Sequence, residues 1–116
     1  MAGASSQAGS GSITPVALAG QIEAGAAPFV LDVRSRAEYR AGHVPGATHI
    51  PFWLLPFLWA RIRDTREARV VVYCGHGPRA WMAAGYLRRR GFRDVIELKG
   101  HWSAWQRHRL PVVAGE

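Results

Sequence analysis

A single cysteine stands where a β-branched run meets a glycine-rich loop. The run ends at Tyr73, Cys74 follows, and the loop continues through Gly75, His76, Gly77, Pro78, Arg79 and Ala80. Two glycines and a proline fold the chain tightly, so backbone N–H groups can surround the sulfur and a helix N-terminus can point at it. Because both effects stabilise an anion, the thiol should ionise more easily than a free one. The pattern predicts a nucleophilic thiolate at Cys74, in a cradle of amides from Gly75 to Ala80 that could also bind a negatively charged substrate.

The loop composition favours a catalytic cysteine over a structural one. A lone cysteine at a strand end is more often a small buried hydrophobe. A structural cysteine, however, does not require Gly75 and Gly77 beside it, nor Arg79 five residues later. Arg79 carries a permanent charge on a fork that matches the oxygens of an anion, and the first turn of a helix is otherwise an unfavourable place for a cation. We therefore predict that Arg79 binds the anionic end of the substrate.

Five further polar residues are candidates for roles near the site. His76 could stabilise the thiolate or shuttle a proton, or it could be a solvent-facing loop residue. Asp32 and Arg34 could form an ion pair or brace the loops around the site. Glu38 is explained by a capping box at a helix start, and His43 by a hydrogen-bonded turn. We assign the last four to the scaffold, with Asp32 and Arg34 placed behind the site.

Composition and charge narrow the classes of function. The chain has 116 residues, enough for one domain with a real core. Its formal net charge of +7 suits anionic substrates or an acidic partner. No RNA-binding motif accompanies that charge, so we expect no nucleic-acid partner. One cysteine excludes both an internal disulfide and an internal resolving thiol, so an external molecule must discharge any sulfur held on Cys74. The sequence has no Cys/His cluster with metal-ligand spacing.

The N-terminal segment is expected to be a flexible tail over residues 1–12, ahead of a single domain over residues 13–116. After Met1 the tail contains only Ala, Gly, Ser and Gln. It has neither the positive charge nor the apolar core of a signal peptide. We therefore expect the protein to work in the cytoplasm.

The segment from Phe52 to Ala60 is the most apolar part of the chain and contains no charged residue. It is too short for a transmembrane helix, which needs about 20 residues. A helix that is apolar on all sides should be buried or should dock something. We predict that Trp53, Phe57 and Trp59 belong to an exposed patch that docks a partner protein or contacts a membrane surface. Burial in the core or self-association is the alternative.

Helical and strand patterns alternate along the chain. Helices are expected from Thr14 to Gly25, Ser35 to Gly42, Trp53 to Arg63, Ala80 to Arg90 and Trp102 to His108. Strands are expected over Phe29–Asp32, Thr48–Ile50, Arg69–Tyr73 and Val95–Leu98, with a short one at Ile13. This alternation predicts an α/β fold with a parallel sheet and helices on both faces. Sites in such folds lie at the carboxyl ends of the strands, where Asp32, Cys74 and Leu98 fall.

Three motifs in order resemble those of rhodanese-like domains. They are LDVRSRAEYRAGHVPGA over Leu31–Ala47, the Cys74 loop of form C-x-x-G-x-R, and LKGHWSAW over Leu98–Trp105 followed by Leu110-Pro111-Val112. The resemblance covers nearly everything from Ile13 to Val113 and implies a five-stranded sheet. It also implies a sulfurtransferase, in which Cys74 takes a sulfane sulfur from a donor such as thiosulfate. The resulting persulfide would pass that sulfur to cyanide or a thiol.

The chain departs from the family pattern at two places. His101 follows Gly100 where relatives usually have two glycines, so its side chain must fit near the rim of the site. The apolar Phe52–Ala60 segment is the other departure, because relatives commonly carry polar residues there. It motivates the alternative function of a persulfide carrier, loaded and unloaded by partners docked at the face of Trp53–Trp59.

Two further alternatives are weaker. A phosphatase or arsenate reductase of related fold needs a loop of form C-x5-R, and here the arginine comes five residues after Cys74 and Ala80 comes six after. An inactive structural domain is disfavoured by the presence of Cys74, Gly77 and Arg79.

Overall fold

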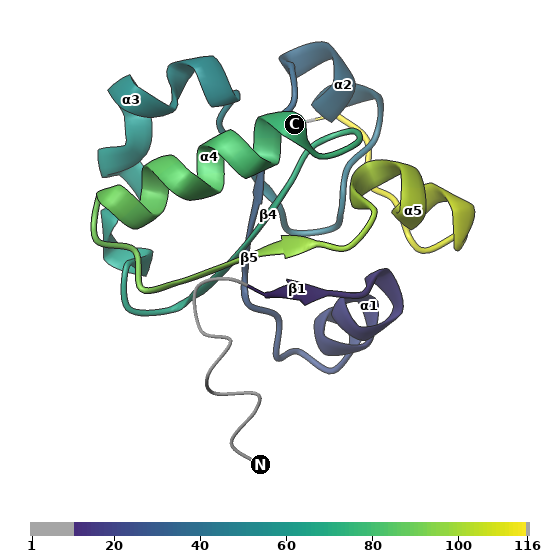
Figure 1. Ribbon diagram of the computed structural model, residues 1–116. Helices are drawn as coiled ribbons and strands as arrows, with labels where there is room; N and C mark the ends of the chain where they lie inside the picture. The colour runs from purple at the N-terminus through teal and green to yellow at the C-terminus, as the bar shows by residue number, and fades with distance from the viewer. Residues whose placement is uncertain (1–10, 116) are drawn as a thin grey trace.

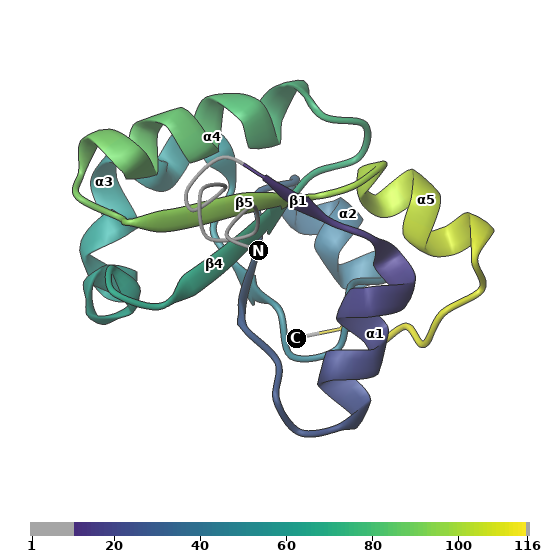
Figure 2. The ribbon, with the colours of Figure 1, turned by 60° about the horizontal axis from the view of Figure 1, so that its bottom comes forward.

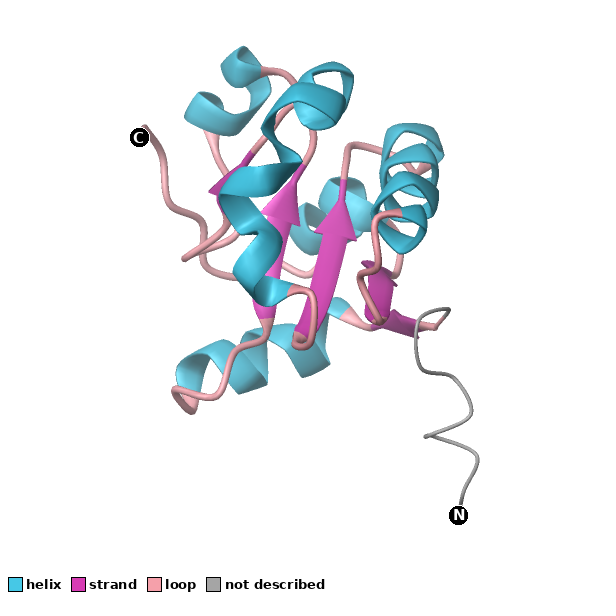
Figure 3. Ribbon diagram, turned by 90° about the vertical axis from the view of Figure 1, so that its left-hand side faces the viewer, coloured by secondary structure: helices cyan, strands magenta, loops and turns pink. Residues whose placement is uncertain are grey.

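The computed structural model describes residues 11–115, which form one parallel five-stranded sheet between two helical layers (Figure 1). The strands are β1 (Ser12–Ile13), β2 (Phe29–Asp32), β3 (Thr48–His49), β4 (Arg69–Tyr73) and β5 (Asp94–Leu98). Their order across the sheet is β1-β5-β4-β2-β3, and every neighbouring pair is parallel. Figure 3 shows the strands between the helices. The predicted fold class, with its five strands, is confirmed.

The helices divide between the two faces of the sheet. They are α1 (Pro15–Glu23), α2 (Arg36–Ala41), α3 (Leu55–Leu58), α4 (Pro78–Arg89) and α5 (His101–Arg107). Alternate residues of β4 point to opposite faces, so Val70 and Val72 pack with α3 and α4, while Val71 and Tyr73 pack with α1 and α5. Figure 2 shows α4 on one side of the strands and α1 on the other.

Local sequence signals set most of the element ends. The Thr14 side chain accepts the Ala17 N–H at the start of α1. The Ser35–Glu38 capping box is complete at the start of α2. Two helices begin slightly earlier than expected, since α4 starts at Pro78 rather than Ala80 and α5 starts at His101 rather than Trp102.

The segment from Trp53 to Arg63 is not the single helix that was expected. It consists of the 3-10 helix η2 (Phe52–Leu54), one turn of α3 and the 3-10 helix η3 (Trp59–Thr65). Pro56 has no N–H to donate to the Phe52 carbonyl, and this carbonyl instead accepts the Leu55 N–H in a 3-10 turn. A second break lies at Ile62, whose φ and ψ of −116° and 16° are not helical. The breaks let the segment bend over the sheet with Leu55 and Ile62 buried.

The expected boundary of the N-terminal tail is one residue late, because Ser12 already pairs with Glu97 in β1. Residues 1–10, on which the remaining expectations about a tail and a signal peptide rest, lie outside the described residues. Within residues 11–115, no helix combines the length and apolarity required to cross a bilayer.

Candidate active site

Cys74 follows β4 at the carboxyl edge of the sheet and is fully buried. Its Sγ accepts the N–H of Gly77 at 3.0 Å and the N–H of Ala80 at 3.4 Å. Ala80 lies in the first turn of the 12-residue helix α4, so both amides and the helix dipole point at the sulfur. Pro78 has no N–H, and its fixed φ suits the first helical position. The loop therefore offers Sγ the donors that negative charge requires.

The first turn of α5 ties down the backbone around Cys74. The Cys74 carbonyl accepts the Trp102 N–H at 2.9 Å, and the Gly75 carbonyl accepts the Ser103 N–H at 3.2 Å. The Cys74 N–H donates to Nδ1 of His101 at 3.3 Å. These three bonds connect two distant motifs and hold the loop rigidly against α5.

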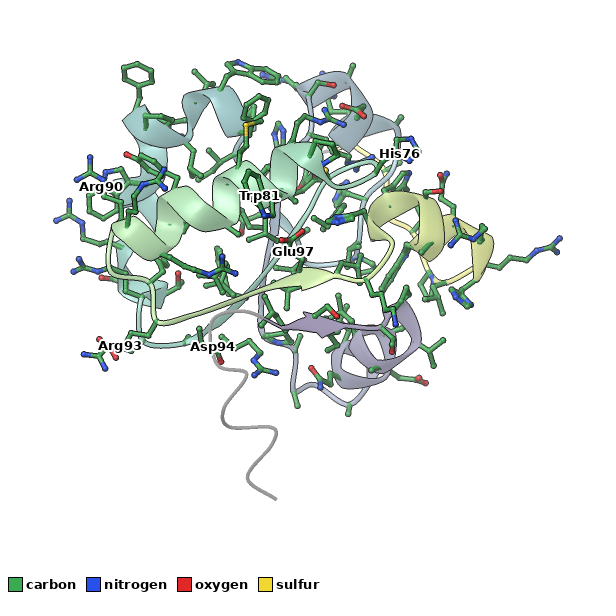
Figure 4. The ribbon with its side chains drawn as sticks, viewed as in Figure 1. His76, Trp81, Arg90, Arg93, Asp94 and Glu97 are labelled. Atoms are coloured by element: carbon green, nitrogen blue, oxygen red, sulfur yellow. The ribbon has the colours of Figure 1, made fainter. Side chains whose placement is uncertain are left out.

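Gly75 and Gly77 of the loop are glycines for two different structural reasons. Gly77 has φ of 138°, a conformation that residues with a Cβ rarely adopt. A Cβ on Gly75 would come within 3.2 Å of Nη2 of Arg79, so Gly75 leaves room for that guanidinium. His76, in contrast, is exposed at the tip of the loop (Figure 4). Pro78 is exposed as well, and Ala80 is buried beside the sulfur.

Arg79 is paired with a carboxylate and does not lie open above Cys74. Nη1 and Nη2 of Arg79 donate to the two carboxylate oxygens of Glu38 at 2.8 and 3.2 Å. Hydrogen bonding to Glu38, with a smaller contribution from the Cys74 sulfur, raises the pKa of Arg79 although burial opposes this. The Arg79 bonds lower the pKa of Glu38 to about 2, helped by bonds with Ser35. An anionic substrate would therefore have to replace Glu38 as the partner of Arg79.

Glu38 is the site residue that sequence reasoning missed. The capping box accounts for the bond between the Glu38 carboxylate and the Ser35 N–H. The second role depends on a contact across 41 positions of sequence, which no local pattern reveals. Glu38 therefore belongs to the rim of the site as well as to the scaffold.

Asp32 and Arg34 form the predicted ion pair, and it is almost completely buried. Nη2 of Arg34 lies 2.7 Å from the Asp32 carboxylate, with side-chain exposures of 2% and 0%. The same nitrogen donates to the Gly42 carbonyl, and the guanidinium lies over the rings of Tyr73 and Trp102. Burial acts to lower the pKa of Arg34, but the bonds and charge of Asp32 outweigh it and raise that pKa. His43 is also buried, and its Nδ1 bonds the Tyr39 carbonyl, as expected of a structural histidine.

A cavity of about 270 Å³ adjoins this region of the site. Its lining residues are Arg34, Glu38, Ala41, Gly42, Trp102, Gln106 and Val112. Glu38 faces both this cavity and Arg79, so a molecule in the cavity would lie next to the ion pair at the thiol. Among the described residues, no group of three His, Cys, Asp or Glu side chains is placed to hold a metal ion.

The apolar segment is only partly exposed, and one prediction for it is wrong. Trp53 and Phe57 are 50% and 79% exposed, as expected. Trp59 instead packs edge-on to Phe92 and has three arginine side chains around its ring, those of Arg63, Arg66 and Arg90. Phe57 and Trp59 are two residues apart, and side chains at this spacing do not face the same side of a helix. Exposed Trp81 and Met82 of α4 were not predicted. Met82 lines one hollow with Trp53 and another with Trp81. We call these three residues, with the exposed Leu54 and Phe57 of the neighbouring segment, the apolar face.

Known proteins resemble this chain in sequence and in fold. The family model of the rhodanese-like domain matches residues 14–108. A sulfurtransferase of Allochromatium vinosum is 39% identical over 88 residues, which cover 76% of this chain and 80% of that protein. The thiosulfate sulfurtransferase GlpE of Pseudomonas fluorescens is 39% identical over 78 residues, covering 66% of this chain and 69% of the relative. The crystal structure of a rhodanese-related protein from Thermoplasma volcanium superposes with a TM-score of 0.77 at 29% identity, covering 89% of this chain and 97% of that one. The chain therefore belongs to the family of rhodanese-like domains.

Proposed function

We propose that this protein is a sulfurtransferase that carries a sulfane sulfur as a persulfide on Cys74. The observation that carries the proposal is the pair of N–H groups aimed at a fully buried Sγ, at the only cysteine of the chain. Such donors stabilise an anionic sulfur, and in the persulfide the outer sulfur carries the negative charge. Relatives named sulfurtransferase, at 39% identity, support the same reaction class.

The reaction balances with thiosulfate as donor. The Cys74 thiolate attacks the outer sulfur of thiosulfate, an S–S bond forms, and the S–S bond of the donor breaks as sulfite leaves with its electron pair. Arg79 exchanges Glu38 for the anionic end of the donor during this step. Cyanide then attacks the outer sulfur of the persulfide and leaves as thiocyanate, or a thiolate takes the sulfur in the same way. Either acceptor regenerates the Cys74 thiolate.

Intact-mass spectrometry tests this chemistry directly. Incubation with thiosulfate should add the mass of one sulfur atom, and cyanide should remove it with release of thiocyanate. Cys74→Ser is the control, because the hydroxyl keeps the acceptor position but cannot carry a sulfane sulfur. A wild-type protein that gains no sulfur from thiosulfate or from an organic persulfide would refute the proposal, as would substantial turnover by the serine variant.

The exposed apolar face favours a second candidate, a persulfide carrier that serves a partner protein. Two hollows on this face, of about 270 and 340 Å³, share Met82 and Arg89 among their lining residues. No acidic residue lines either hollow, and Arg88 lines the second. Apolar pockets edged by arginine suit an acidic protein that inserts an apolar side chain. We propose such a partner rather than a membrane surface, because a flat bilayer cannot fill a hollow.

A photo-crosslinking residue at Phe57 would test the carrier function in the source cell. Capture alone does not show that a protein receives sulfur. Each captured protein would therefore be purified and incubated with this protein carrying a labelled sulfane sulfur on Cys74. The expected result is that the label moves from the wild type to the captured protein and that Met82→Ser loses this transfer, because Met82 lines both hollows. Cyanide should remove the sulfur from the wild type and from Met82→Ser at equal rates. Equal rates of transfer to the captured protein would remove the face from the reaction.

A further inference from the structure

His101 occupies a backbone conformation that normally requires glycine. Its φ is 56°, directly after Gly100 with φ of 75°. Within residues 11–115, Arg109 is the only other residue besides glycine with a positive φ. A side chain in this region is strained unless its surroundings compensate. The backbone of this turn therefore suits two successive glycines. The presence of a histidine at the second position has to be explained by the contacts of its side chain.

The contacts of His101 admit one tautomer. The side chain is 9% exposed, with Nδ1 3.3 Å from the Cys74 nitrogen and Nε2 3.4 Å from Oε1 of Glu97. A backbone N–H can only donate, so Nδ1 must be the acceptor and carry no proton. In the neutral ring the proton then lies on Nε2, which faces the Glu97 carboxylate. Both interactions are satisfied by the same neutral ring.

We propose that His101 is a positioning residue for Cys74: its neutral, Nε2-protonated ring holds the Cys74 amide and fixes the thiol in its cradle, and protonation of Nδ1 releases it. A proton on Nδ1 would face the Cys74 N–H, and two donors cannot bond. Of the three bonds between the loop and α5, this one alone involves a side chain and can be switched. The role rests on the proposed function only in that it positions the nucleophile.

The charged groups around His101 come from three elements. Glu97 on β5 favours the protonated ring, and His76 on the loop opposes it. Burial raises the pKa of Glu97, and the charge of Arg88 on α4, which donates to the Val95 carbonyl, opposes that rise. Cys74 itself is the fourth facing group. Burial first, and His76 second, lower the pKa of His101 from its ordinary 6.5, so the ring is neutral at neutral pH and is protonated only in acid.

Alkylation of Cys74 by iodoacetamide, followed by mass spectrometry between about pH 5 and pH 8, tests the proposal. His101→Asn is the matched variant, because asparagine tolerates positive φ, places its carbonyl oxygen near the position of Nδ1 and does not titrate. Above the pKa of His101 the alkylation rates of wild type and His101→Asn should agree within about twofold. Below that pKa the ratio of the wild-type rate to the variant rate should fall by up to about tenfold per pH unit, because only the wild type loses the acceptor of the Cys74 N–H.

Two further measurements keep the test decisive. In the wild type, the ¹⁵N spectrum of His101 should show an unprotonated Nδ1 at about pH 8, and this needs no variant. In Glu97→Gln the fall of the ratio should move to lower pH, since removal of the carboxylate charge disfavours the protonated ring. A proton on Nδ1 at that pH would overturn the proposal. So would a ratio that stays constant or rises as the pH falls, which would mean that the charged ring only assists the thiolate.

The alkylation test does not depend on sulfur transfer, because Cys74 is the only thiol that can react. A protein that shows the expected pH ratio and never gains sulfur would contradict the proposed function alone. A protein that gains sulfur and shows a constant ratio would contradict the role of His101 alone.

Discussion

Two arginine–carboxylate pairs take their carboxylates from the N-terminal motif of this protein and differ in their access to water. The Asp32–Arg34 pair is almost completely buried, and Arg34 is further held by the Gly42 carbonyl and by two aromatic rings. In the Glu38–Arg79 pair the side chains are 39% and 28% exposed. The bond lengths of 2.7 and 2.8 Å hardly differ. Solvent access, and not bond geometry, therefore separates the two pairs.

Because they differ in exposure, the two ion pairs are suited to different roles. A buried pair cannot open cheaply, because each separated charge would remain in a region of low dielectric. It fixes the loops between β2, α2 and α5. A half-exposed pair is screened by water and contributes little to stability, so another anion can replace its carboxylate. The second pair is thus suited to receive a substrate at the thiol.

The largest expected effect comes from breaking the buried pair on one side only. Asp32→Ala should lower the free energy of unfolding by about 3–5 kcal/mol, because Arg34 is left as an uncompensated buried charge. Urea denaturation at neutral pH measures the loss. The double variant Asp32→Leu with Arg34→Met should recover much of it, since no charge remains buried. A single variant as stable as the wild type would show that the pair is not structural.

Arg79→Ala should have its main effect on the substrate. Loss of a charged hydrogen bond, about 1.5–3 kcal/mol, should raise the KM for thiosulfate roughly 10- to 150-fold. The free energy of unfolding should change by less than about 1 kcal/mol. Steady-state kinetics with thiosulfate and with a donor uncharged at that end separate the effects, because the uncharged donor should be much less affected. Equal losses with both donors would mean that Arg79 shapes the loop and does not bind the anion.

Most of the fold could be predicted from local sequence patterns. The bounds of β2 and β4 follow from short apolar runs between turn residues, and the start of α2 follows from its capping box. The segment after Pro51 could not be predicted, because two breaks in its backbone follow from Pro56 and from packing over the sheet. The exposure of Trp59 could not be predicted for another reason, because its ring packs against Phe92 and Arg90 from a distant part of the chain.

The site could be predicted only as far as the loop itself extends. The position of Cys74 and the cradle around it follow from residues close in sequence. The partners of Arg79 and of the Cys74 amide lie 41 and 27 residues away. Both contacts depend on how α2 and α5 pack beside the loop. The periodicity of apolar residues does not predict which distant segments come together. The one sequence signal of such a partner was His101, which departs from the two-glycine pattern that the family resemblance implies.

Glu38→Gln tests whether the carboxylate of Glu38 competes with the anionic donor for Arg79. Glutamine can keep the capping box at α2, and it removes the charge that competes with the donor. The KM for thiosulfate should fall severalfold, in the direction opposite to Arg79→Ala. Ser35→Ala is the matched control, because it damages the same helix start and leaves the pairing carboxylate in place. A higher KM in Glu38→Gln would mean that Glu38 holds Arg79 in its binding position and does not block it.

The smallest expected effect is on acid stability. The pKa of Glu38 lies at about 2, below its ordinary 4.5, because Arg79 stabilises the carboxylate. The unfolded chain therefore binds more protons than the folded one between these values. The contribution of Glu38 should be complete above about pH 4.5 and should disappear as the pH falls toward about 2. Since Glu38 is 39% exposed, solvent screening should keep its contribution to stability below about 1 kcal/mol.

The free energies of unfolding of wild type and Glu38→Gln, measured in urea at about pH 7 and pH 3, should therefore converge in acid. A gap that is equal at both pH values would show that the ion pair contributes nothing to folding, so that Glu38 acts only on the substrate.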